Sequence, residues 1–546
     1  RIRRPPRATL VPYSTLFRSI CQKLHYRGKS YFLKNKFTTM ERKLIINSVF
    51  LALALLAGLG CKKFLNKDIQ GVYSASQYYT TSNGAIQAIN AAYTPLTFVS
   101  GTANPLWVFG DVASDDAASG NPAASPDAAT IDNFSYSATN SHLSNEWSNF
   151  YEGITNCNLV LANVPAINMD TALRSRILAE ARFLRAWYYF KLVNIYGDVP
   201  IVLTSLTPAQ MQITQSPKKE IYESVIEPDL KAALKILPAS YGGADVGRAT
   251  SGAAASLLAK VYLYQEKWDT SLIYSNMVIN SGQYQLMKIY SQNFDGLHKN
   301  NKESIFEVQM LGGQTPNVGN ALNQWFAPQI VGGYYCDAPN QNFVNEFEET
   351  SDSVYDPRLD YTVGRDSMLW NNGEYFLSSW SPQTGYLTRK FQQPLSLAPI
   401  IGQGNCDYTA IRYADVLLFN AEALNESGQT SAAIIPLNEV RKRARESYLY
   451  DSTLTGYGSV PTGLLPDIPA ISQDQVRMAI IHERRVELGF EFHRFFDLMR
   501  YGANSNLGPD YVNQLINRDG ITKFSYAADN TFPIPQSERD RDKALH

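Results

Sequence analysis

The sequence predicts a mainly α-helical protein, in which tetratricopeptide-like helix pairs form a scaffold beside a loop-rich subdomain with short β strands. Apolar residues recur at three- and four-residue spacing mainly through 141–282 and 409–500, as in amphipathic helices. Helical spacing is lost mainly in 97–140 and 283–408, where Gly, Pro, Asn, Ser and Tyr are frequent. The 546 residues, 45% of them hydrophobic, are ample for a large buried core.

The first long helices are predicted from spacing and from the residues that stop them. Trp147, Phe150 and Ile154 share one helical face until Pro165 ends the helix. A second helix is expected over 172–196, with Gly197 directly after its end. Further helices are expected near 84–96, over 218–238, over 410–426 and 431–446, and over 473–492; residues 304–310 are expected to form a strand.

Residues 249–282 carry the pattern of a helix–turn–helix pair. Small residues such as Ala253 and Ala259 allow close packing, and large ones such as Tyr262 fill the gaps between helices. A turn is expected near Lys267, with the second helix opening at Trp268. The length matches the tetratricopeptide period of about 34 residues, and several such pairs predict a solenoid-like layer.

The N-terminal part has the layout of an export signal. Met40 is the expected true start, Arg42 and Lys43 precede an apolar run, and small residues precede Cys61. We expect 40–60 to be a lipoprotein signal peptide and Cys61 to be lipidated, although Gly58 stands where such signals usually carry Leu. An ordinary signal peptide cut nearby is the alternative, and residues 1–39 are interpreted as non-native upstream translation.

The charge distribution argues against a nucleic-acid partner. Residues 1–60 hold 12 of the 49 Lys and Arg but only one acidic residue, so the remainder carries 37 basic and 49 acidic residues. Phosphate binding needs a clustered basic surface, which such an acidic chain does not suggest. Beyond Cys61 only three cysteines remain, too few for a disulfide framework.

Five motifs, in order along the chain, resemble those of the SusD/RagB family of nutrient-binding outer-membrane lipoproteins. They are CKKFLNK (61–67), LAEARFLRAWYYFKLVNIYGDVP (178–200), IRYADVLLFNAEALNESG (411–428), ERRVELGFEFHRFFDLMRYG (483–502) and FPIPQSE (532–538). Together they span nearly all of 61–546, which is interpreted as one SusD-like domain. The ending DKALH departs from the short aromatic tail that many members carry.

The resemblance implies a helical scaffold with a looped subdomain that faces the ligand. It also implies a cell-surface, lipid-anchored protein of the outer membrane that captures an oligosaccharide or other nutrient without catalysis. The captured ligand would pass to a TonB-dependent, SusC-like transporter. A tetratricopeptide-like protein-interaction scaffold, or a peptide-binding lipoprotein of the same system, remains the alternative.

Sequence motifs for catalysis are few. The chain has no G-x-S-x-G, no Walker A and no G-x-G-x-x-G, and no cofactor is expected. His482-Glu483 begins like the zinc motif H-E-x-x-H, but Val486 occupies the second His position. Asp115 and Asp116 could pair with another carboxylate as a glycosidase acid/base; a solvated acidic loop or a structural hydrogen-bonding site is the favoured interpretation. The charged motif 483–502 is likewise expected to be structural, with Glu487 and Glu491 one turn apart, Arg484 and Arg494 within reach of carboxylates, and Phe492, Phe495 and Phe496 packed inward.

Sugar binding requires aromatic faces for pyranose stacking and polar groups for hydroxyls, on loops held by a rigid scaffold. Two loop clusters offer both, at 104–116 and 323–335. The candidate ligand-binding residues are Asn104, Trp107, Asp115 and Asp116 of the first cluster, and Asn323, Trp325, Tyr334 and Tyr335 of the second. Further, weaker candidates are Trp370, Tyr375 and Trp380. The core is expected to contain Trp147, Trp187 and Trp268.

Overall fold

The computed structural model describes residues 79–205, 210, 212–394, 396–398, 400–517, 520 and 522–545. The segment 1–39, the expected signal peptide 40–60 and Cys61 lie outside the described residues. Among the described helices, none is both long enough and apolar enough to cross a membrane.

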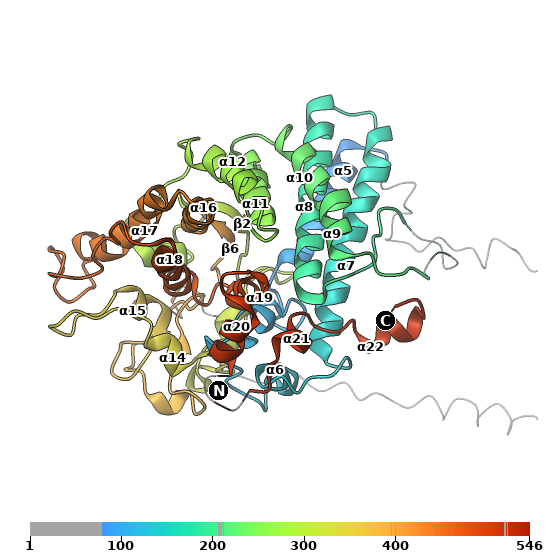
Figure 1. Cartoon of the computed structure of the whole chain (residues 1–546). Helices are drawn as coiled ribbons and strands as arrows, with labels where there is room; N and C mark the ends of the chain where they lie inside the picture. The colour runs from blue at the N-terminus through green and yellow to red at the C-terminus, as the bar shows by residue number, and fades with distance from the viewer. Residues whose placement is uncertain are drawn as a thin grey trace, which may run out of the picture. The chain divides into compact units, whose positions relative to one another are not determined.

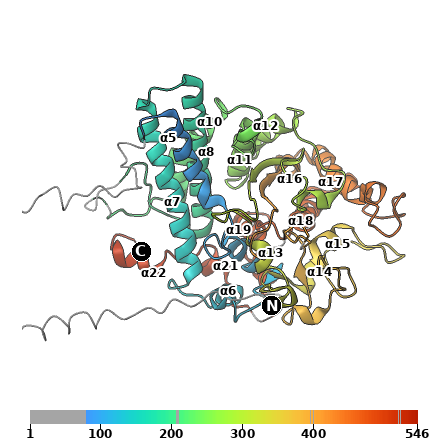
Figure 2. The same cartoon turned by 180° about the vertical axis from the view of Figure 1, so that it is seen from behind.

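The mainly α-helical fold is confirmed, and α7 (Ser141–Asn163) and α8 (Thr171–Tyr196) form its longest pair. Both helices begin at side-chain caps, since Asn140 accepts from the backbone N–H of His142 and Asp170 accepts from that of Leu173. A short connection containing Pro165 joins them, which favours antiparallel packing. Figures 1 and 2 show α7 and α8 side by side, flanked by α5 (Ser82–Tyr93) and α10 (Glu227–Leu234).

The predicted helix–turn–helix is present as α11 (Ser251–Leu263) and α12 (Trp268–Ile279). Ala253, Ala254 and Ala259 are fully buried, so the two backbones approach closely enough for Ser271 Oγ to donate to the Ala259 carbonyl at 2.9 Å. Tyr262 and Tyr274 stack across the pair, with ring centroids 5.7 Å apart. The small–large alternation in the sequence therefore corresponds to direct helix–helix packing.

The third helical group contains α16 (Tyr413–Glu426), α17 (Thr430–Tyr450) and α18 (Gln473–Leu488). The helix expected from residue 410 begins later, because Tyr408–Arg412 forms strand β6 and pairs antiparallel with β2 (Ser304–Val308). Every residue of β6 is buried, and its Tyr, Thr and Ile side chains suit a strand. Such a short, wholly buried run shows no alternation that would reveal a strand.

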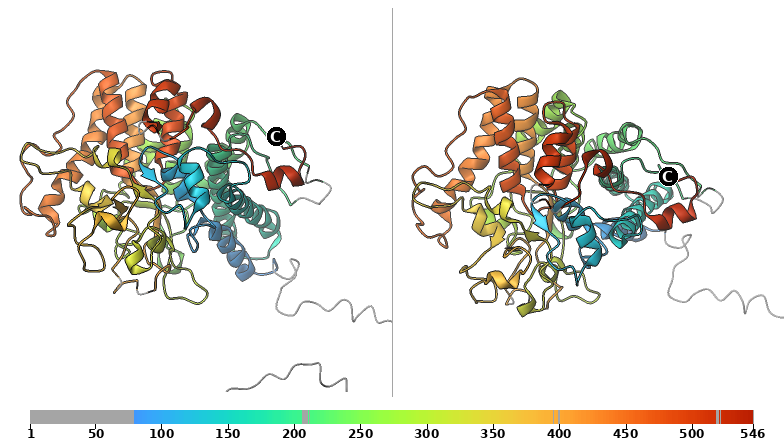
Figure 3. Two further views of the ribbon diagram at one scale, coloured as in Figure 1. Left: turned by 90° about the horizontal axis from the view of Figure 1, so that it is seen from below. Right: turned by 60° about the horizontal axis from the view of Figure 1, so that its bottom comes forward.

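The remaining elements are short and irregularly connected. Two more antiparallel pairs, β1–β3 and β4–β5, lie in the loop-rich region. Figure 3 shows the loops of residues 300–400 gathered beneath the helices of α16 and α17. The other elements are α6 (Pro126–Asp132), α9 (Lys218–Ile221), α13 (Leu322–Trp325), α14 (Gln341–Val344), α15 (Arg358–Thr362), α19 (Arg494–Ala503), α20 (Gly508–Ile516), α21 (Tyr526–Asp529), α22 (Gln536–Arg541), β1 (Ala117–Ala118), β3 (Ala338–Pro339), β4 (Val363–Gly364) and β5 (Leu387–Thr388).

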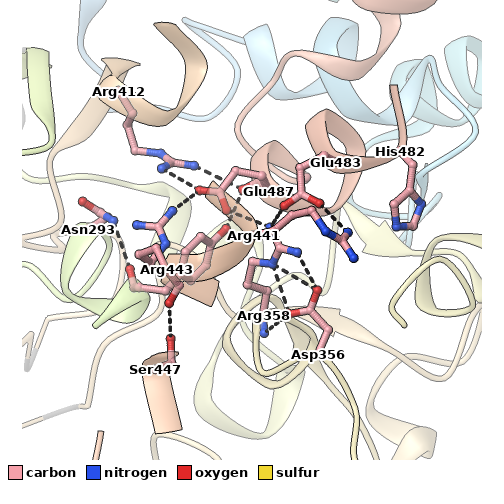
Figure 4. Close-up of polar contacts among 12 residues, drawn as sticks. Asn293, Asp356, Arg358, Arg412, Arg441, Arg443, Ser447, His482, Glu483 and Glu487 are labelled. Carbon is pink, nitrogen blue, oxygen red and sulfur yellow. Dashed lines mark hydrogen bonds and ion pairs between the residues drawn. The ribbon is translucent and has the colours of Figure 1, made fainter. Parts of the chain in front are cut away.

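A buried ionic network centred on Glu487 of α18 joins the loops to the scaffold (Figure 4). Glu487 is fully buried and contacts the guanidinium groups of Arg358 and Arg412 at 3.0 Å each, and that of Arg443 as well. Burial alone would raise the pKa of Glu487, but the three guanidinium groups outweigh it and hold this pKa at about 2. Glu487 therefore stays ionised inside the protein.

The network extends outward from these arginines to further carboxylates. Arg412 also contacts Glu491 at 2.7 Å, and Glu491 in turn accepts from Lys390 at 2.7 Å. Glu303, which directly precedes β2, forms an ion pair with Arg443 at 2.8 Å and another with Arg412. The loop region and the strands are thereby joined to α17 and α18 through charged groups.

The motif 483–502 is buried and ion-paired, as predicted, and the structure identifies the carboxylates that its arginines contact. Arg484 contacts Asp415 at 2.9 Å and Asp497 at 2.9 Å. Phe492, Phe495 and Phe496 do pack inward, with at most 4% exposed. The spacing of residues in the sequence predicts which charged side chains lie on these helices, but tertiary packing decides which carboxylates pair with which arginines.

We expect Glu487→Gln to destabilise the protein strongly, by ~3–5 kcal/mol, because it leaves three buried arginines without their shared anion. Glu223→Gln is the matched control, since Glu223 belongs to an exposed pair with Lys219 at 3.8 Å; an exposed pair contributes below about 1 kcal/mol. Urea unfolding monitored by circular dichroism measures both. Equal stabilities of the two variants would show that the network is dispensable.

Candidate functional site

The first predicted loop cluster is a buried part of the core. Trp107 leads into a π-helical segment, Val108–Val112, whose five residues are all buried. The Trp107 side chain has 0% exposure, and its Nε1 donates to the Gly101 carbonyl at 2.9 Å. The prediction that Trp107 is an exposed sugar platform is therefore wrong, because a fully buried ring cannot meet a ligand.

The polar candidates of this cluster are also occupied within the fold. Asn104 is 3% exposed and donates from Nδ2 to the Leu96 carbonyl at 3.2 Å. Asp115 pairs with Arg494 at 2.7 Å, and Asp116 pairs with Arg485 at 2.6 Å. Like Trp107, these groups are too buried to meet a ligand, at 3% exposure or less, and they contact partners within the fold instead.

The two aspartates titrate differently although they are neighbours. Burial opposes ionisation of Asp115, but Arg485 and Arg494 outweigh it and hold the pKa of Asp115 below its usual range. At Asp116 burial dominates and raises the pKa to about 6. Such a split is typical of acid/base pairs, yet both groups are at most 3% exposed. The geometry favours a structural role over the hydrolase hypothesis.

The second predicted cluster forms an exposed turn with a fixed backbone. The Tyr334 N–H donates to the Gln324 carbonyl at 3.0 Å, and the Cys336 N–H donates to the Trp325 carbonyl at 2.8 Å. A glycine is required at position 333, just before Tyr334, because a Cβ there would lie 2.1 Å from the Ala327 carbonyl oxygen. These contacts hold the end of α13 and the returning chain side by side.

Trp325 and Tyr334 form an aromatic pair at the surface, which we call the aromatic platform. Their ring centroids are 5.2 Å apart in an edge-to-face arrangement. Tyr334 is 37% exposed and Trp325 is half-buried. Figure 2 shows α13, which ends at Trp325, among the loops of the irregular region.

The buried Trp107 lies beneath this platform. The Trp107 and Trp325 ring centroids are 5.8 Å apart with an interplanar angle of 41°. Gly101 lets the backbone approach, since a Cβ there would lie 2.4 Å from Trp325 Nε1. The structure thus does bring the two predicted loops together, but one loop supports the aromatic surface that the other presents. The close approach at Gly101 was missed by sequence reasoning, and only its glycine offered a signal.

Asn323 and Tyr335 hold the platform in place and do not extend it. Asn323 is 7% exposed, and its Oδ1 accepts from the Gly402 N–H at 3.2 Å, so its predicted ligand contact is wrong. Tyr335 is half-buried and packs against the small apolar cluster of Trp370, Phe376 and Leu387. Trp370, one of the weaker candidates, is buried in that cluster. Ile330, four residues before Tyr334 in the chain, is 59% exposed and was not among the candidates.

His482 and the cysteines show structural roles. Burial would lower the pKa of His482, but hydrogen bonds to Glu346 and Glu348 outweigh it and raise this pKa to about 9. Cys157, Cys336 and Cys406 are buried free thiols. Within the part of the chain that the structure describes, no group of three or more His, Cys, Asp or Glu side chains is placed to hold a metal ion.

Two different family models match the two halves of the chain. Residues 302–546 match a family model described as the SusD family. Residues 101–263 match a second model, described as starch-binding associating with outer membrane.

Individual relatives extend the likeness over most of the chain. SusD-like protein P2 of Formosa agariphila is 27% identical over 524 residues, which cover 90% of this chain and 96% of that protein. A solved laminarin-binding SusD-like protein is 27% identical with a TM-score of 0.71, covering 86% of this chain and 99% of its own. Surface glycan-binding protein A from Bacteroides uniformis is 25% identical with a TM-score of 0.70, covering 85% and 99%.

Because Trp107 supports the platform from within, we expect Trp107→Ala to cost ~3–5 kcal/mol of unfolding free energy, as for other large-to-small core changes. Trp325→Ala is the matched control and should cost about 1–2 kcal/mol, since it removes less buried area. Chemical unfolding of both variants checks this difference. An equal loss would contradict the layered arrangement of the two rings.

Proposed function

Since the chain belongs to the SusD/RagB family, we propose that it binds an oligosaccharide at the aromatic platform of Trp325 and Tyr334. The observation that carries the proposal is a Trp–Tyr pair at the surface, between the end of α13 and a turn, where the backbone is fixed by hydrogen bonds. Aromatic rings offer apolar faces to the C–H faces of pyranose rings, and the tyrosine hydroxyl adds a hydrogen-bonding group.

The comparisons support this ligand class. A relative of similar length and fold is a laminarin-binding protein, and another is a surface glycan-binding protein. We propose a neutral glycan, captured without catalysis. The two carboxylates that could have acted as acid and base, Asp115 and Asp116, are buried in ion pairs.

We further propose that the protein is tethered to the outer membrane by a lipid on Cys61, faces the exterior, and passes its glycan to a TonB-dependent, SusC-like transporter. The signal-like run before Cys61 supports the anchor. The description of the family model over 101–263 supports association with the outer membrane.

The double variant Trp325→Ala/Tyr334→Ala should stay folded and lose affinity for the bound oligosaccharide by about 30-fold or more, as for aromatic hot spots that contribute at least ~2 kcal/mol. Titration calorimetry with laminarihexaose, maltohexaose and cellohexaose measures this. Tyr457→Ala, which removes a tyrosine 53% exposed in the loop after α17, is the control and should bind like wild type.

Two outcomes would contradict the proposal. Unchanged affinity of the double variant would remove the platform from the site. Absence of binding by wild type to the three oligosaccharides, together with stable co-purification of a transporter, would favour the protein-interaction scaffold.

Lipidation predicts that Cys61→Ala moves the protein from the membrane fraction to the soluble fraction of a bacterium that processes lipoproteins. Cys157→Ala is the control, because Cys157 is buried in α7 and should leave the fractionation unchanged. Immunoblots of separated fractions measure both variants. Retention of Cys61→Ala in the membrane would speak against the anchor.

A further inference from the structure

A concave cavity of about 680 Å³ lies among α14, α15 and the loop that precedes β5. Its base is apolar, since Phe347 and Leu359 line it and are at most 4% exposed. The volume falls within the range of about 300–1,000 Å³ that is typical of small-molecule sites. None of the residues of the aromatic platform lines it.

One wall of the cavity is a hydrogen-bonded row of polar side chains. The Tyr386 hydroxyl donates to Gln341 Oε1 at 2.6 Å, and Gln341 Nε2 donates to Asn345 Oδ1 at 2.8 Å. Each side chain in the row is therefore oriented by its neighbour. Such a row presents fixed donors and acceptors at low conformational cost, which favours binding of a ligand with many hydroxyl groups.

A second tyrosine, Tyr355, and a cation, Arg365, also line the cavity. Tyr355 is 38% exposed, and the Arg365 guanidinium carbon lies 5.6 Å from its ring centroid. Arg365 is held by Asp360, which accepts from Nε at 3.1 Å and from Nη2 at 2.5 Å. In the antiparallel register Gly364 of β4 pairs with Leu387 of β5, so Arg365 directly follows one strand and Tyr386 directly precedes the other at the same end of the pair.

The charges that line the cavity argue against an anionic ligand. Glu349 and Asp366 both line it, while the cation Arg365 is already paired with Asp360. A phosphate or uronic acid would meet two carboxylates and one neutralised guanidinium. A neutral, hydroxyl-rich ligand can donate to the same carboxylates, hydrogen-bond the polar row and pack against the apolar base.

We propose that this cavity is a second binding site for neutral oligosaccharide, separate from the aromatic platform. The ligand class rests on the proposed function, whereas the site itself rests on the cavity's own lining. Tyr335, next to Tyr334 in the chain, and Leu387, next to Tyr386, pack in the same cluster with Trp370 and Phe376. One rigid apolar cluster therefore supports both sites.

Hydrogen–deuterium exchange of the intact protein with laminarihexaose, maltohexaose and cellohexaose tests the two sites separately. Peptides covering 341–349 and 378–386 report on the cavity, and peptides covering 322–335 report on the platform. We expect one of these hexasaccharides to slow exchange at the cavity in wild type and also in Trp325→Ala/Tyr334→Ala. In the double variant Tyr355→Ala/Tyr386→Phe, half-maximal protection of the cavity peptides should require at least tenfold more of that hexasaccharide.

Tyr375→Ala is the control, because Tyr375 is 67% exposed in the same region but does not line the cavity. Protection at 322–335 alone would overturn the second site and leave the proposed function standing. Protection at the cavity alone would support the second site and overturn the platform. No protection at either place with the three hexasaccharides would overturn both.

Discussion

The shared carboxylate of Glu487 is the constraint on which the arrangement of helices and loops depends. Burying one carboxylate and three guanidinium groups is costly unless every partner is in place. Arg358, Arg412 and Arg443 come from α15, β6 and α17, so the network is satisfied only when all three elements meet α18 in one geometry. Apolar packing alone tolerates more than one such geometry, since it has no directional requirement.

This constraint explains how a region with little regular structure can carry a fixed surface. Lys390, in the loop after β5, donates to the Gly489 carbonyl and to Glu491, both at 2.7 Å, just beyond the end of α18. Farther from the network, backbone hydrogen bonds join one loop to another. For example, the Asn320 N–H donates to the Gly404 carbonyl at 2.8 Å. The aromatic platform is therefore connected to the scaffold through loops that have few alternative positions.

Local periodicity made the helix pairs predictable, because the turn near Lys267 and the start at Trp268 depend on neighbouring residues alone. The site was less predictable, because exposure is decided by distant segments. Trp107 and Trp325 are both tryptophans in segments rich in Gly and Asn, yet Trp107 is buried between Gly101 and Phe326 while Trp325 reaches the surface. No feature within residues 104–116 indicates that Trp107 is covered. In the same way, residues 408–412 show no alternation that would reveal the strand before α16.

The chain contains 33 tyrosines, and for these too the role depends on tertiary burial. Tyr188, Tyr196 and Tyr290 are buried and donate to backbone carbonyls at 2.6–2.7 Å, so they fill the core and satisfy acceptors at once. Tyr334 and Tyr355 present the same chemistry at the surface. A tyrosine becomes a candidate ligand contact only where a rigid backbone or a fixed neighbour exposes part of its ring. That neighbour is Trp325 for Tyr334 and Arg365 for Tyr355.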